Sequence, residues 1–148
     1  MSKINRRAAW ALFVIYCAVM LWLLFARSGS GIRGVSLVPF ATINEFWTVM
    51  QQSFGREGME MLFIISFVNL AGNVVMFIPL GFFLPLLWRS LRRWWGSPAL
   101  CAAVIIAVEA LQFITGRGSA DIDDFILNML GSAVGYVFFA GFQKVRAR

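Results

Sequence analysis

The chain has 148 residues, of which 60% are hydrophobic, 16% aromatic and only 14% charged, and its mean hydropathy is +0.78. This composition lies far outside the range of a soluble domain of similar size. The sequence therefore predicts an integral membrane protein and leaves no segment for a separate soluble domain.

Four apolar stretches are long enough to cross a bilayer, at about residues 9–26, 62–88, 99–115 and 122–142. They predict an all-α fold with four transmembrane helices in one domain, residues 1–148. A cleaved signal peptide is the alternative for the first stretch, which follows basic residues. That stretch exceeds the usual ~7–15 apolar residues of a signal peptide, and no small-x-small cleavage site follows it, so we interpret it as an uncleaved helix.

The basic residues are distributed unevenly between the two ends of the predicted spans. With the N-terminus inside, nine of the 13 Lys and Arg residues fall on the cytoplasmic side, which predicts that both termini are cytoplasmic. All seven acids fall toward the outer side. Basic clusters and a pI of about 10.4 are also compatible with nucleic-acid binding. Each cluster adjoins a spanning helix, however, so we favour topology anchors beside lipid headgroups and expect no nucleic-acid partner.

The long outer connection, residues 27–61, contains one further helix signal. Thr42-x-x-Glu45 matches a capping box, and apolar residues follow it at helical spacing. We predict an amphipathic helix at about residues 43–54, too short to span the membrane. It would lie along the outer surface as an anchor or cover the mouth of the bundle as a lid.

Amides and carboxylates interrupt the predicted spans near their outer ends. At about 1.5 Å per residue, Asn69, Glu109 and Asn128 each lie roughly 10 Å below the outer surface and should form one layer. Gln112 and Asp124 are one turn nearer the outside. Asn73 is one turn deeper, and the rim of the opening is formed by Arg117, Asp121 and Asp123.

Helical phase places each set of polar residues on one stripe of its helix. Below Asn128 the stripe continues as Gly131 and Gly135, small residues that permit close helix contact. Pro79 is expected to kink the second span. With no His in the chain and two isolated Cys residues, Cys17 and Cys101, we expect no transition metal, haem or other cofactor and no disulfide.

Two interpretations of the polar residues remain open. Asn and Gln can pair across helices and glycines can pack, which is a structural role. Glu109 differs, because a carboxyl group two turns inside hydrocarbon is a functional candidate by default.

At these residues the chain resembles the VanZ-like family of bacterial membrane proteins, named after a teicoplanin-resistance protein. The resemblance covers about residues 37–136. Its motifs are Leu37-Val38-Pro39-Phe40-x-Thr42-Ile43, Asn69-x-x-x-Asn73-x-x-x-Phe77-x-Pro79-x-Gly81, Glu109-x-x-Gln112, Gly116-Arg117, and Asp121-x-Asp123-Asp124-x-x-x-Asn128-x-x-Gly131-x-x-x-Gly135-Tyr136. The resemblance implies a small protein with four to five spans, and a link to glycopeptide tolerance.

The sequence supports two main hypotheses for function. The first is a non-catalytic protein of the bacterial cytoplasmic membrane whose outward-facing polar pocket binds the headgroup of a lipid or lipid-linked cell-envelope precursor. Arg117, with Arg33, would pair with phosphate, and the amides would form hydrogen bonds to sugar or phosphate oxygens. The candidate ligand-binding residues are Asn69, Asn73, Glu109, Gln112, Arg117, Asp121, Asp124 and Asn128.

The rival is an intramembrane enzyme in which Glu109 and Asp124 act as acid and base or share a divalent cation with amide oxygens. The sequence offers it no recognisable nucleophile. Proton-coupled transport ranks last, because the inner halves of the spans lack a continuous polar path. Structural roles are expected for Pro39, Phe40, Gly72, Phe77, Pro79, Gly81, Gly131 and Gly135.

Overall fold

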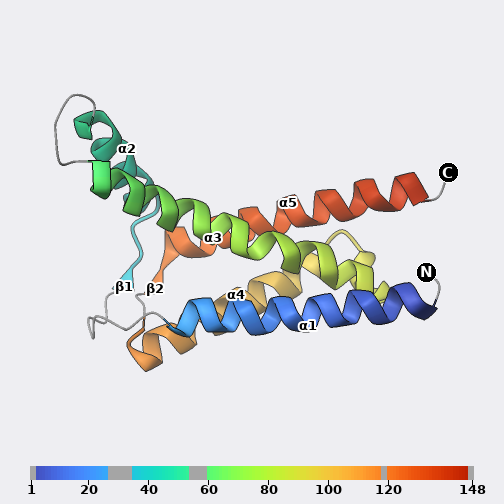
Figure 1. Cartoon of the computed structure of the whole chain (residues 1–148). Coiled ribbons are helices and arrows are strands. Elements are labelled where there is room, and N and C mark those ends of the chain that lie inside the picture. The colour runs from blue at the N-terminus through green and yellow to red at the C-terminus, as the bar shows by residue number, and fades with distance from the viewer. Residues whose placement is uncertain (1–2, 27–34, 54–59, 118–119, 147–148) are drawn as a thin grey trace.

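The computed structural model of the chain is a bundle of long helices (Figure 1) and describes residues 3–26, 35–53, 60–117 and 120–146. Four helices are long and apolar enough to cross a membrane, as the sequence predicts. The elements in chain order are α1 (Lys3–Ala26), β1 (Val35–Ser36), α2 (Ala41–Ser53), α3 (Glu60–Leu87), the 3-10 turn η1 (Arg89–Arg92), α4 (Gly96–Thr115), β2 (Ala120–Asp121) and α5 (Ile122–Arg146).

The most extensive contact in the fold is between α3 and α5. These two helices run in the same direction, because α4 returns the chain between them (Figure 1). α1 begins and α5 ends at one end of the bundle, and α2 lies at the opposite end. Which end faces the cytoplasm remains a prediction from the charge distribution.

Three glycines bring the backbones of α3 and α5 together. A Cβ added to Gly131 would lie 2.0 Å from the carbonyl oxygen of Val74, and one added to Gly135 would lie 2.0 Å from that of Ile78. Gly81 of α3 approaches the carbonyl of Ser132 in the same way, at 1.9 Å. No side chain can be inserted at these positions without separating the helices, so the three glycines form a backbone seam.

Other residues expected to have structural roles have different environments. Gly72 has open space around its Cβ position. Phe77 is 1% exposed, while Pro39 is exposed. α3 runs as one helix through Pro79, and the Tyr16 hydroxyl of α1 donates to the nearby Met76 carbonyl at 2.9 Å.

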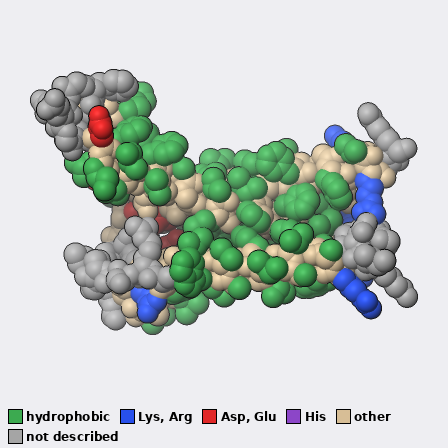
Figure 2. Space-filling view, in the orientation of Figure 1, with side chains coloured by type: hydrophobic (Ala, Val, Ile, Leu, Met, Phe, Trp, Pro, Cys, Tyr) green, Lys and Arg blue, Asp and Glu red, His purple; other side chains and the backbone are tan. Residues whose placement is uncertain are grey.

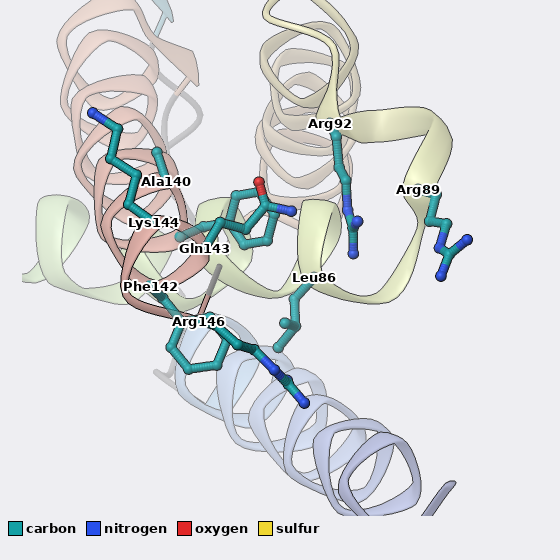
Figure 3. Close-up of a pocket in the computed structure, with 9 residues that line it drawn as sticks. Leu86, Arg89, Arg92, Ala140, Phe142, Gln143, Lys144 and Arg146 are labelled. Atoms are coloured by element: carbon teal, nitrogen blue, oxygen red, sulfur yellow. The ribbon is translucent and has the colours of Figure 1, made fainter. Parts of the chain in front are cut away.

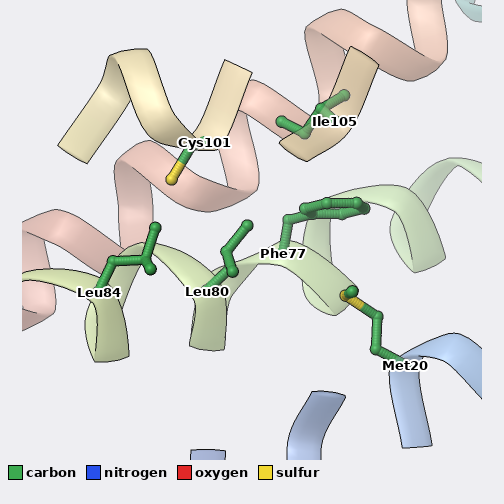
Figure 4. Close-up of a cluster of buried hydrophobic side chains, with 6 residues drawn as sticks. All are labelled: Met20, Phe77, Leu80, Leu84, Cys101 and Ile105. Carbon is green, nitrogen blue, oxygen red and sulfur yellow. The ribbon is translucent and has the colours of Figure 1, made fainter. Parts of the chain in front are cut away.

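The buried apolar cluster lies between α1, α3 and α4 (Figure 4). Phe77, Leu80 and Leu84 of α3 face Cys101 and Ile105 of α4, and Met20 of α1 closes the cluster. Both Cys17 and Cys101 are free, consistent with packing roles. Most other large apolar side chains are exposed, as expected where lipid covers the surface.

The short helix α2 differs from the predicted helix in its start and its contacts. It begins at Ala41, so Thr42 is inside the helix and does not cap it, contrary to the capping-box prediction. Phe46 packs against Phe63 and Phe67 of α3, with ring centroids 5.7 and 6.4 Å apart, whereas Trp47 is 56% exposed. Phe54, the last residue of the predicted helix, lies outside the described residues.

Candidate functional site

The polar residues predicted to converge meet where α3, α4 and α5 pass one another. Asn128 of α5 donates from Nδ2 to Oε1 of Glu109 on α4, at 3.4 Å. Asn73 of α3 donates from Nδ2 to Oδ1 of Asp124 on α5. We call these four residues the polar cluster.

Two oxygen atoms in the polar cluster are buried without a hydrogen-bond partner among the described residues. They are Oε2 of Glu109 and Oδ1 of Asn128. Asn128 as a whole is only 3% exposed. A buried acceptor without a donor costs roughly 1–3 kcal/mol, so the pair of oxygens calls for a donor from outside the described contacts.

Acidic groups dominate the electrostatics around the cluster. The carboxyl groups of Glu109, Asp121 and Asp124 are close enough to interact with one another, and the backbone of Asp121 approaches Glu109. Arg117 is exposed, and among the described residues it forms no ion pair with these acids. The described part of the chain contains no group of three or more His, Cys, Asp or Glu placed to hold a metal ion.

A second acidic contact joins α5 to the loop before α2. Asp123 is fully buried, and its carboxylate accepts the backbone N–H of Phe40 at 2.6 Å and that of Thr42 at 2.7 Å. It thereby caps the N-terminus of α2 from 81 residues away in the sequence. Asp121 accepts the Thr42 hydroxyl at 3.3 Å, and its own backbone segment β2 pairs in parallel with β1.

The contacts of Asp123 also explain the backbone of Phe40. Phe40 has φ of 65°, in the left-handed region that residues other than glycine rarely adopt. This conformation turns its N–H toward Asp123. Sequence reasoning placed Asp123 at the rim of the pocket and missed this role, because the motif Asp121-x-Asp123-Asp124 does not indicate which partner each carboxylate has.

Three predicted site residues lie apart from the polar cluster. Asn69 is exposed, one turn before Asn73, the α3 residue that contacts Asp124. Gln112 donates from Nε2 to the Leu24 carbonyl of α1 at 3.4 Å. Arg117 projects from the loop after α4, and Arg33 lies outside the described residues.

The described geometry defines a class of protein. Four helices are long and apolar enough to cross a membrane, and three of them, α3, α4 and α5, bring a small set of amide and carboxyl groups into contact. The chain is a multi-pass membrane protein with a polar cluster between its helices.

The chain belongs to the VanZ/LLP1 family, whose sequence profile matches residues 13–143. This match covers nearly the whole chain, including every residue of the polar cluster. No curated protein and no solved structure matches the chain.

Proposed function

We propose that the polar cluster binds the headgroup of a lipid or lipid-linked cell-envelope precursor in the bacterial cytoplasmic membrane. The observation that carries this proposal is the pair of unpartnered buried acceptors, Oε2 of Glu109 and Oδ1 of Asn128. Both atoms are buried, they belong to two side chains that contact each other, and both require a donor. A hydroxyl group of a sugar or glycerol headgroup supplies one.

The charge of the cluster indicates which part of such a headgroup it would recognise. Glu109 and Asp124 offer acceptors, while Arg117, which follows the C-terminal end of α4, is an exposed cation. Hydroxyl groups would therefore enter the cluster, while phosphate would remain at the rim with Arg117. This division refines the expectation that the amides bind sugar or phosphate oxygens.

The test is retention of a co-purified lipid by the full chain, measured by native mass spectrometry in detergent. Glu109→Gln is the informative variant, because glutamine preserves the shape and can form a two-bond amide pair with Asn128. We expect it to fold normally and to lose most of the retained lipid. Glu60→Gln, which removes an exposed acid from the first turn of α3, is the matched control and should retain lipid. Equal lipid retention by wild type and Glu109→Gln would refute the proposal.

An intramembrane enzyme is the second candidate, and one observation favours it. Glu109 and Asp124 come from different helices yet lie close enough to interact electrostatically, an arrangement that suits an acid and base pair. Mass spectrometry of the retained lipid before and after incubation distinguishes the two functions. A changed headgroup with wild type, absent with Asp124→Asn, would indicate catalysis, and an unchanged headgroup would indicate binding.

Family membership supports a proposed link to glycopeptide tolerance. If the protein protects a cell-envelope precursor, expressing it in a susceptible bacterium should raise the teicoplanin concentration needed to stop growth. Glu109→Gln should then remove that increase, while Glu60→Gln should keep it. An increase that persists in Glu109→Gln would separate tolerance from the polar cluster.

A further inference from the structure

A second candidate site lies at the opposite end of the bundle from the polar cluster. There a cavity of about 650 Å³ opens between the C-terminal end of α3, η1 and the last turns of α5 (Figure 3). Its lining residues are Leu86, Arg89, Arg92, Phe139, Ala140, Phe142, Gln143, Lys144 and Arg146. We call it the basic pocket.

The basic pocket has a net positive charge, because nearby negative charge does not balance its Lys and Arg residues. Four of its nine lining residues are Lys or Arg and none is acidic. The C-termini of α3 and α5 each contribute about half a negative charge, so they offset roughly one of the four cations. Figure 2 shows a similar asymmetry on a larger scale: most of the visible Lys and Arg atoms lie at this end, with some also at the other end, and acidic side chains are visible only at that other end.

One arginine of the pocket is held in place by the protein. Nε of Arg92 donates to the Pro85 carbonyl at 3.1 Å, and its guanidinium carbon lies 5.8 Å from the centre of the Phe139 ring. The backbone carbonyl of Arg92 also accepts the Tyr136 hydroxyl at 3.0 Å. The two terminal nitrogens of this guanidinium remain available, and a fixed planar fork suits the bidentate binding of phosphate oxygens.

The remaining cations surround the space from two elements. In Figure 3, Arg92 and Arg89 project from η1, while Arg146 projects from α5 below Leu86. Lys144 points away from the other three. All three arginines are exposed, so an anion can reach them from the surface.

The walls of the pocket indicate an amphipathic ligand. Leu86, Phe139, Ala140 and Phe142 contribute apolar surface beside the cations, and Phe142 is 42% exposed toward the outer face of α5. Trp94 and Trp95, at the same end, are 80% and 53% exposed, as in the aromatic belt where a membrane meets water. A phospholipid whose phosphate lies at this level would extend its acyl chains along the apolar face of α5.

From these observations we infer that the basic pocket binds the phosphate group of an anionic phospholipid in the leaflet on the side of the two termini. Arg92 is the fixed phosphate ligand, and Arg89 and Arg146 contribute further positive charge around the phosphate. This site is independent of the polar cluster, because no residue is shared and the recognised groups differ.

The test uses the full chain in nanodiscs that contain phosphatidylglycerol and phosphatidylcholine. Native mass spectrometry after release from the disc should show that wild type retains phosphatidylglycerol preferentially. Removing two cations by Arg89→Gln with Arg146→Gln should reduce that preference about 25-fold, at roughly fivefold for each exposed ion pair with the bound phosphate. Neither side chain has a hydrogen bond among the described contacts, so folding should be unaffected.

The control variant removes the same charge from the same end of the bundle without touching the pocket. Arg6→Gln with Arg7→Gln in α1 meets this requirement, since neither residue lines the cavity. An equal loss of phosphatidylglycerol in both double variants would overturn the inference, because it would mean that only the total surface charge matters. Binding of inorganic phosphate in detergent, with no phospholipid retained, would also overturn it.

Discussion

Replacing Asp123 by asparagine should loosen α2 without disrupting the four spans. The native carboxylate accepts two backbone N–H groups, from Phe40 and Thr42, at 2.6 and 2.7 Å. A hydrogen bond to a charged group contributes about 1.5–3 kcal/mol, and asparagine keeps one of the two acceptor oxygens while turning an N–H donor toward the other site. The expected loss is therefore about 2 kcal/mol of local stability, or roughly thirtyfold in the opening equilibrium.

Hydrogen exchange followed by mass spectrometry measures this loss directly in the purified full chain. Peptides covering the start of α2 should exchange about thirtyfold faster in Asp123→Asn, while peptides from the α3 and α5 seam should keep their protection. Glu45→Gln, at an exposed position of α2, is the control and should leave exchange unchanged. Unchanged exchange at the start of α2 in Asp123→Asn would refute the capping argument.

Two further predictions concern the seam and the orientation. Gly131→Ala should destabilise the protein by about 1–3 kcal/mol, because its Cβ meets the Val74 carbonyl. Gly141→Ala, whose Cβ would lie in open space, should be neutral or slightly stabilising, and thermal unfolding in detergent compares the two variants. In a background without Cys17 and Cys101, an impermeant thiol reagent on intact cells should label a cysteine at Arg117 but not one at Trp95, and the reverse pattern would invert the predicted topology.

The spans and the seam could be predicted from sequence because each depends on a local pattern. About 18 or more apolar residues suffice to predict a membrane helix, and all four expected spans are helices of the structure. Gly131 and Gly135 are four residues apart on one face, and both lie against α3. The estimated depth along the helices likewise predicted that Glu109 and Asn128 lie in one layer, and the two side chains are in contact.

Relations between distant segments could not be predicted in the same way. Depth and spacing placed Asn69 with Asn73, but they do not say which of the two side chains reaches α5; Asn73 contacts Asp124, whereas Asn69 is exposed. The sequence predicted that a local capping box, Thr42-x-x-Glu45, begins α2. In the structure the cap comes from Asp123, which is 81 residues from Thr42. The basic residues of η1 and α5 had a sufficient explanation in membrane topology, so nothing in the sequence indicated that they share a cavity.

The seam between α3 and α5 also determines which parts of the bundle can rearrange. Backbone atoms in direct contact leave no side chains whose rotamers could absorb a displacement, so these two helices behave as one rigid body. α4, which carries Glu109, and α1 pack through side chains, and in the described part of the chain Gln112 joins the two helices by a long hydrogen bond of 3.4 Å. A route from the bilayer to Glu109 would therefore open by displacement of α1 and α4, with the paired helices serving as the fixed wall.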